Sequence, residues 1–127
     1  MKRDMDLMRA ILLDIEALPE PSRGYYFLEG TDEDMFLHNM TLLVEKELVS
    51  AKQWSTHDRH PGRWFAMVSL TWAGSDFLDT VRDDEIWRKT KAGAKAAGGF
   101  SFDMMKSLAK GLVKMQIEKH TGIKLDI

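Results

Sequence analysis

The chain has 127 residues, of which 44% are hydrophobic, and this favours one compact domain with an extension over two full domains. Its net charge of −2 is an average that hides a division along the chain, and the absence of cysteine excludes disulfides, thiolate zinc sites and a cysteine nucleophile. No apolar run approaches the roughly 20 residues that span a bilayer, and acids occupy the start of the chain where a signal peptide is apolar, so we expect a cytoplasmic protein without membrane contact.

The first predicted element is a helix from about Asp4 to Ala17. Asp4 is a suitable N-cap, and Pro19 follows the end of the pattern. The short aromatic segment 25–28 lies between two glycines, so we predict a strand there that pairs beside a later hairpin. The apolar residues with helical spacing in the first element are Met8, Ile11, Leu12, Ile15 and Leu18.

The stretch 32–48 is predicted to be the central helix of the fold. Its apolar residues recur at i, i+4, i+7 and i+8, which is one face of a helix and fits no strand period. Thr31 or Asp32 can cap this helix, and acids at its start complement the positive end of the helix dipole. If this helix contacts DNA, the side chains available for bases or phosphates are His38, Asn39, Thr41 and Lys46.

A β-hairpin is predicted directly after this helix. Two runs of alternating residues, 48–54 and 64–70, flank a polar stretch that contains Pro61 and Gly62. Alternation places Phe65 and Met67 on the same face of the second strand. The loop would form a flexible wing whose Arg59 and Arg63 can lie along a phosphate backbone.

Two further helices are predicted after the hairpin. Thr71 caps the first, where Gly74 is expected to permit close backbone packing, because glycine inside a helix costs about 1 kcal/mol relative to alanine. Asp83 or Asp84 caps the second, which ends near Ala97 before a Gly-Gly pair.

The last predicted helix runs from Phe102 to about Lys119, with Ser101 as its cap. Its apolar stripe needs a partner surface, either the domain itself or another protomer. The residues proposed for this interaction or dimerisation are Met105, Leu108, Leu112 and Met115. Along another side runs a row of lysines, Lys106, Lys110 and Lys114.

These elements predict an α+β, mainly α fold: a winged helix-turn-helix-like domain at 1–83, with a β-hairpin wing, followed by a basic C-terminal helical extension at 84–127. Charge follows a similar division. Residues 1–85 contain 9 Lys and Arg against 17 Asp and Glu, a net charge of −8, whereas residues 86–127 contain 9 against 3, a net charge of +6. A basic element can contact nucleic acid, or it can pair with the acidic part of its own chain or of a second copy.

Several segments together resemble a family of short bacterial and phage proteins that is known only as a domain of unknown function. The opening Met1–Leu7 and the Arg82–Trp87 segment are the most specific, and they are joined by Leu70–Asp79 and Gly98–Phe102. The resemblance implies a winged-helix-like domain and brings no activity, ligand or functional residue with it.

The succession of Leu42–Val49, a hairpin and Leu70-Thr71 is similar to the recognition helix, wing and following helix of bacterial winged-helix regulators. Glu47 stands where those regulators usually have a glycine. The interval from Gly30 to Met35 leaves little room for a separate second helix. Both departures keep the topology and weaken the expectation of DNA binding.

No pattern of catalytic or metal-binding residues is present. His57 and His60 have no further ligand nearby in sequence, and an exposed loop explains them better than a metal site. A helix start explains Asp83, Asp84 and Glu85 better than paired catalytic carboxylates. We therefore expect no cofactor, no metal and no enzymatic activity.

Two functions remain open. The topology favours a non-enzymatic regulator, of bacterial, phage or prophage type, that contacts double-stranded DNA through the central helix and the wing. The acidic N-terminal part favours an interaction module that has lost DNA binding and uses its last helix to form a homodimer or to bind a host or phage protein.

Overall fold

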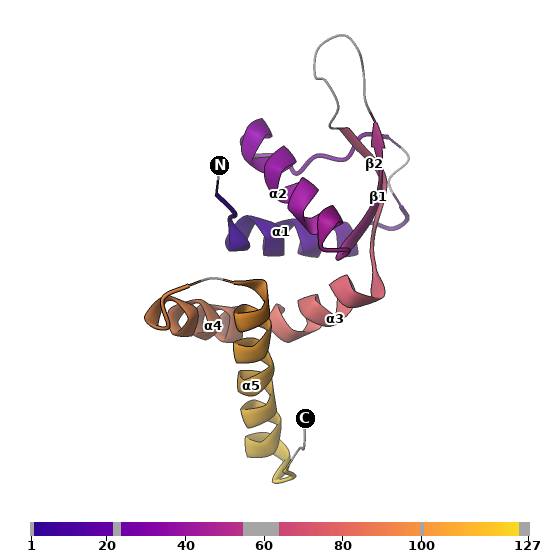
Figure 1. Ribbon diagram of the computed structural model, residues 1–127. Helices are drawn as coiled ribbons and strands as arrows, with labels where there is room; N and C mark the ends of the chain where they lie inside the picture. The colour runs from indigo at the N-terminus through magenta and orange to yellow at the C-terminus, as the bar shows by residue number, and fades with distance from the viewer. Residues whose placement is uncertain (1, 22–23, 55–63, 100, 125–127) are drawn as a thin grey trace. The chain divides into compact units, whose positions relative to one another are not determined.

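The structure is a computed structural model, and it describes residues 2–21, 24–54, 64–99 and 101–124. These residues form five helices and one antiparallel hairpin (Figure 1), so the α+β, mainly α prediction is confirmed.

The chain divides into two compact units, Met1–Leu78 and Asp79–Ile127. The domain boundary between residues 83 and 84, expected from the sequence, remains a prediction. In chain order, the elements are α1 (Met5–Glu16), α2 (Glu33–Glu45), β1 (Val49–Trp54), β2 (Trp64–Leu70), α3 (Trp72–Val81), α4 (Asp84–Ala96) and α5 (Phe102–Thr121).

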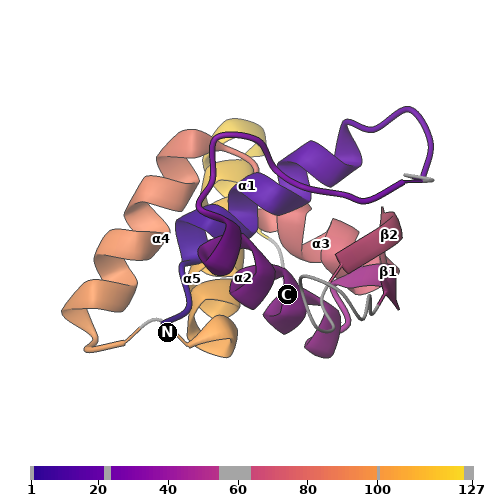
Figure 2. The same cartoon turned by 90° about the horizontal axis from the view of Figure 1, so that it is seen from above.

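Two capped helices and the hairpin build the core of the first unit. The side chain of Asp4 accepts a hydrogen bond from the Leu7 amide at 3.1 Å, and that of Asp32 accepts one from the Met35 amide at 3.0 Å, as predicted for the N-caps of α1 and α2. Helix α1 lies against α2 and β2, while α2 also lies against β1 (Figures 1 and 2). The buried side chains of the two helices are Met5, Met8, Ile11, Leu12 and Ile15 from α1 and Phe36, Asn39, Met40 and Leu43 from α2.

Helix α2 ends in a tight turn that sends the chain directly into β1. The Leu48 amide donates to the Leu43 carbonyl and the Glu47 amide to the Val44 carbonyl, both at 3.0 Å. This pattern ends a helix through a left-handed residue, which is usually glycine. Here Glu47 adopts that conformation, with φ at 63°. The place where Glu47 departs from the regulator pattern is therefore a strained backbone position.

The hairpin is confirmed, but its residues do not alternate throughout. Ser50 pairs with Ser69, whereas Lys52 pairs with Ala66, so β2 contains one extra residue between these two pairs. Met67 lies in this bulge with φ at 54° and its side chain is 57% exposed, while Phe65 is fully buried. The prediction that Phe65 and Met67 share a face is wrong, because a bulge shifts the pleat by one residue.

The predicted strand at residues 25–28 is reduced to a single bridge beside the hairpin. Tyr25 pairs with Ala66, and the Tyr26 amide donates to the Phe65 carbonyl at 2.8 Å. The Tyr26 ring packs against Phe36, and its hydroxyl donates to Oδ2 of Asp14 at 2.6 Å. Burial, followed by the hydrogen bond and the negative charge of Asp14, raises the pKa of Tyr26 above its ordinary value. This segment therefore joins the core through aromatic packing and not through a ladder.

The start of α3 is fixed against the end of α2. The Thr71 hydroxyl accepts from the Gly74 amide at 3.0 Å and donates to the Glu47 carbonyl at 2.6 Å. The Thr71 amide also donates to the Leu48 carbonyl at 3.1 Å. A Cβ on Gly74 would lie 2.0 Å from that same carbonyl oxygen. The predicted cap and the predicted close packing at Gly74 are both confirmed.

The second unit contains α4 and α5, which lie against each other and cross at a large angle (Figure 1). Asp83 caps α4 and Ser101 caps α5, each by accepting from an amide three residues later. The two helices approach closely where a Cβ on Gly93 would lie 3.5 Å from Leu108. Helix α5 ends at Gly122, which adopts a left-handed φ of 71°. The side chains buried in this pair are Ile86, Trp87, Thr90 and Ala94 of α4 and Met105 and Ala109 of α5.

Candidate interaction surface

The residues predicted to contact DNA do not form one exposed group. His38 and Thr41 of α2 are half-buried, and Lys46 at the end of that helix is exposed. The Thr41 hydroxyl donates to the Leu37 carbonyl at 2.6 Å. Arg59 and Arg63 of the predicted wing lie outside the described residues. The structure therefore offers one exposed cation, Lys46, from the described part of this set.

Asn39 must be removed from the set of DNA-contacting residues. Its side chain has no exposed surface. The Asn39 Oδ1 accepts from the Asp4 amide at 2.8 Å, and Nδ2 donates to the Met35 carbonyl at 2.8 Å. Both ends of the amide are thus used to fasten the start of α1 to α2. Asn39 has a structural role because an amide with both groups engaged in the interior cannot reach a base edge.

The exposed surface of α2 and the following turn is acidic. Glu33, Asp34, Glu45 and Glu47 are exposed there, together with Lys46. Negative side chains repel the phosphate backbone, which supplies most of the affinity of a protein for DNA. The charge of this surface therefore opposes its use as a recognition helix.

The predicted interaction residues of α5 fall into two groups. Met105 is fully buried within a single chain, so its assignment as a contact with another protomer is corrected. Leu108 and Leu112 are half-buried, and the Met115 side chain is 65% exposed. The apolar stripe is thus covered at the start of α5 and open toward its end. Within the described residues, no ion pair involves Lys106, Lys110 or Lys114 of the lysine row.

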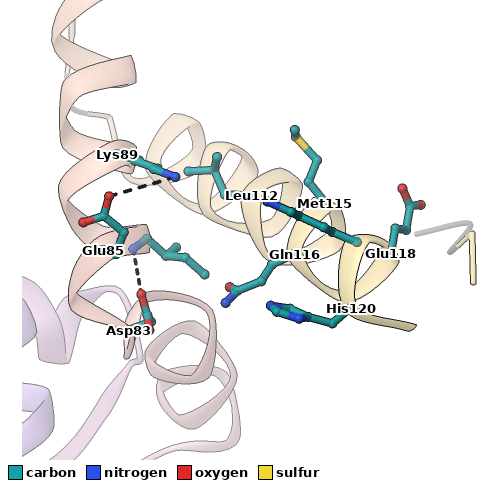
Figure 3. Close-up of a pocket in the computed structure, with 10 residues that line it drawn as sticks. Asp83, Glu85, Lys89, Leu112, Met115, Gln116, Glu118 and His120 are labelled. Atoms are coloured by element: carbon teal, nitrogen blue, oxygen red, sulfur yellow. Dashed lines mark hydrogen bonds and ion pairs between the residues drawn. The ribbon is translucent and has the colours of Figure 1, made fainter. Parts of the chain in front are cut away.

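The open part of α5 borders a groove of about 710 Å³ against the start of α4. Figure 3 shows Gln116 and His120 extending from α5 toward the side where Asp83 lies. Apolar side chains of both helices contribute to the lining, and charged groups line both walls. The groove residues are Asp83, Glu85, Ile86 and Lys89 of α4 and Leu112, Met115, Gln116, Glu118, Lys119 and His120 of α5.

The α4 wall of the groove has a fixed arrangement of charge. Oδ1 of Asp83 accepts from the Ile86 amide at 2.9 Å, and Glu85 lies 4.0 Å from Nζ of Lys89 (Figure 3). Glu85 also forms an ion pair with Arg88, whose guanidinium donates hydrogen bonds to the carboxylate. These hydrogen bonds and the positive charge of Arg88 lower the pKa of Glu85. Glu85 is therefore ionised near neutral pH.

A second, shallower trough of about 500 Å³ lies on α5 itself. Gly111 lines this trough, and a Cβ there would meet nothing within 4 Å. Ile117 and Ile123, beyond the trough, are 39% and 60% exposed. Neither isoleucine was predicted as an interaction residue because neither lies on the sequence stripe. The sequence signal for them is an apolar side chain near the end of the last predicted helix.

The described residues contain no group of three or more histidines and acids placed to hold a metal ion. Within the same ranges, no helix has the length and apolar character required to cross a membrane.

From the sequence, Asp83 and Glu85 are explained by the start of a helix. That explanation is correct and incomplete, since sequence spacing cannot show that the basic end of α5 lies opposite them.

The fold and this surface define a mainly helical α+β protein with a helix–hairpin unit and a C-terminal helix pair. The sequence profile of the family described as "Hypothetical protein (DUF2513)" matches residues 2–101, and the chain belongs to that family. The chain is also 28% identical over 123 residues to an uncharacterized protein of Haemophilus influenzae, covering 92% of this chain and 99% of that protein. No solved structure matches the chain. The relationship to a family of uncharacterised proteins, expected from the sequence, is confirmed.

Proposed function

We propose that this protein is a non-enzymatic interaction module that binds another protein through the second half of α5. The observation that carries the proposal is the exposure of Met115, which is 65% exposed next to half-buried Leu108 and Leu112. Open apolar surface of this kind on a helix is typical of recognition between helices, where side chains at i, i+3, i+4 and i+7 act as anchors.

The energy available from this surface is large enough to matter. Removing a methionine side chain completely from water contributes about 1.5–3 kcal/mol. For Met115 the fraction still exposed corresponds to roughly two thirds of that, or about 1–2 kcal/mol. Ile117 on another face of the same half of the helix, and Ile123 beyond the end of the helix, add further exposed apolar area. Met115 can anchor a partner without any rearrangement of the described core.

The proposal is tested by photo-crosslinking in the organism that encodes the chain. Met115 is replaced by p-benzoylphenylalanine, and the matched control carries the same replacement at Met67, which is 57% exposed on the hairpin. We expect a discrete crosslinked protein species from position 115 and none from position 67. Equal yields at both positions, or no adduct at either, would contradict binding through α5.

A second candidate function is DNA binding through the first unit. The order of α2 followed by a hairpin favours it, because winged-helix regulators place a recognition helix and a wing in this order. Lys46, together with Arg59 and Arg63 of the predicted wing, would supply the phosphate contacts. The half-buried His38 and Thr41 would lie at the base edges.

This candidate predicts affinity for a random duplex that falls steeply as salt increases. Fluorescence anisotropy with a labelled duplex measures it, using Lys46→Glu to remove the exposed cation of α2 and Lys110→Glu as a control on α5. Loss of affinity only with Lys46→Glu supports contact through the first unit. Absence of binding at low salt excludes this candidate.

A further inference from the structure

We propose that the groove between α4 and α5 receives the end of α5 from a second copy of this chain. The inference rests on the proposed function and names the partner of the same surface. In the resulting dimer, each α5 is both a wall of its own groove and the occupant of the groove in the other copy. One two-fold axis then relates two identical contacts, as in most closed homodimers.

The shape of the helix pair provides the space. Helices α4 and α5 are in close contact at Gly93 and Leu108, near the turn that joins them. Toward the other end they enclose the open groove of about 710 Å³, with Ile86 on one side and Leu112 on the other. Met115 borders the same groove and remains 65% exposed. A helix with apolar side chains would complete the packing that the pair begins.

Charge identifies the occupant. On the α4 wall, Glu85 is already paired with Arg88 and Lys89, whereas the carboxylate of Asp83 accepts only from the Ile86 amide in the described residues. The end of α5 presents Lys119 and His120 beside Glu118. Within the described residues no ion pair joins Lys119 to either acid across the groove of the same chain. An occupant that fits must therefore combine apolar side chains with bases at its end. The second half of α5 has this combination.

The positions of these charged side chains follow from the helix dipoles. Acids stabilise the positive start of a helix and bases stabilise its negative end, so the start of α4 and the end of α5 carry opposite side-chain charge. When two copies exchange the ends of α5, Lys119 of one copy approaches Asp83 and Glu85 of the other. The two apolar surfaces around Met115 are then removed from water together.

The experiment is analytical ultracentrifugation of the full chain over a wide range of concentration. We expect a reversible monomer–dimer equilibrium. Met115→Glu should weaken dimerisation by roughly tenfold or more, because it replaces buried apolar area with a charge. Met67→Glu, at a comparably exposed methionine of the hairpin, should leave the equilibrium unchanged. Circular dichroism melting of each variant checks that the fold is intact.

A charge exchange tests the arrangement of the two copies. Lys119→Glu and Glu85→Lys should each weaken the dimer when studied alone. Mixing the two variants should restore it as a heterodimer, because one contact then joins Glu at 119 to Lys at 85 and the other joins the original pair. This restoration requires contact between copies, since no contact within one chain is repaired by mixing.

A full chain that stays monomeric at all concentrations overturns the inference, and so does a dimer that is insensitive to Met115→Glu or is not restored by mixing. These results are separate from those that test the proposed function. A monomer whose position 115 still crosslinks to a different protein refutes the second copy as the partner and leaves binding through α5 standing. No adduct from position 115 at all removes both.

Discussion

Replacement of Gly74 by alanine is the sharpest test of how the first unit is assembled. An added Cβ would lie 2.0 Å from the Leu48 carbonyl oxygen and 2.9 Å from its carbonyl carbon, so backbone must move. Overpacking of this kind costs about 1–3 kcal/mol. The carbonyl that is displaced accepts from Thr71, and the Gly74 amide donates to the hydroxyl of the same residue. Loss of these two hydrogen bonds adds about 1 kcal/mol each.

Against these losses, alanine gains about 1 kcal/mol over glycine in helix propensity. The net expectation for Gly74→Ala is a decrease of about 2–4 kcal/mol in the free energy of unfolding. Urea denaturation followed by circular dichroism measures it. The control is Gly111→Ala in α5, where a Cβ meets nothing within 4 Å and helix propensity alone predicts a gain of up to about 1 kcal/mol. If both variants are equally stable, the close approach to Leu48 is not a determinant of the fold.

Three further changes probe single contacts of the first unit. Asn39→Leu should lower the free energy of unfolding by about 2–4 kcal/mol, since it removes two interior hydrogen bonds and leaves the Asp4 amide without its acceptor; unchanged urea denaturation would contradict this role. Glu47→Gly should raise that free energy by about 1 kcal/mol, because glycine adopts the observed φ of 63° without strain, and a lower melting temperature would contradict the explanation. The pKa of Tyr26 is raised in the folded state by burial and by Asp14. Neutral Tyr26 therefore contributes fully to the stability of the fold below the pKa of tyrosine in the unfolded chain, about 10, and this contribution is lost as the pH rises above that value. Tyr26→Phe should remove that part of the alkaline destabilisation, and identical profiles of stability against pH would exclude it.

The sequence is sufficient to predict the elements whose signals are local. A cap acts on amides two or three residues away and an apolar stripe repeats within one helix, so both can be identified in a short window. The same is true of Gly74, where an unfavourable residue in a helix indicated a close contact. The caps predicted and confirmed in this way are Asp4, Asp32, Thr71, Asp83 and Ser101.

Features that depend on distant residues could not be predicted. Asn39 contacts the amide of a residue 35 positions earlier, and nothing around it in sequence distinguishes an interior amide from an exposed one. The bulge at Met67 depends on the register of two strands, which alternation within one strand does not define. The groove of the second unit requires knowing where α5 continues past its contact with α4. Each of these is a relation between elements, and each changed the interpretation of a predicted residue.

The surface charge of α2 gives a physical reason to prefer protein binding to DNA recognition. Two unit charges 10 Å apart in water interact with about 0.4 kcal/mol before salt screening, so each exposed acid of α2 at that distance from a phosphate opposes binding by about that amount. Lys46 favours binding by as much at the same distance. Four acids against this one base leave a surface that repels phosphate, which the wing arginines would have to overcome. Burial of Met115 in a protein contact meets no comparable opposition, because its flanks in α5 include both bases and acids that an oppositely charged partner can match.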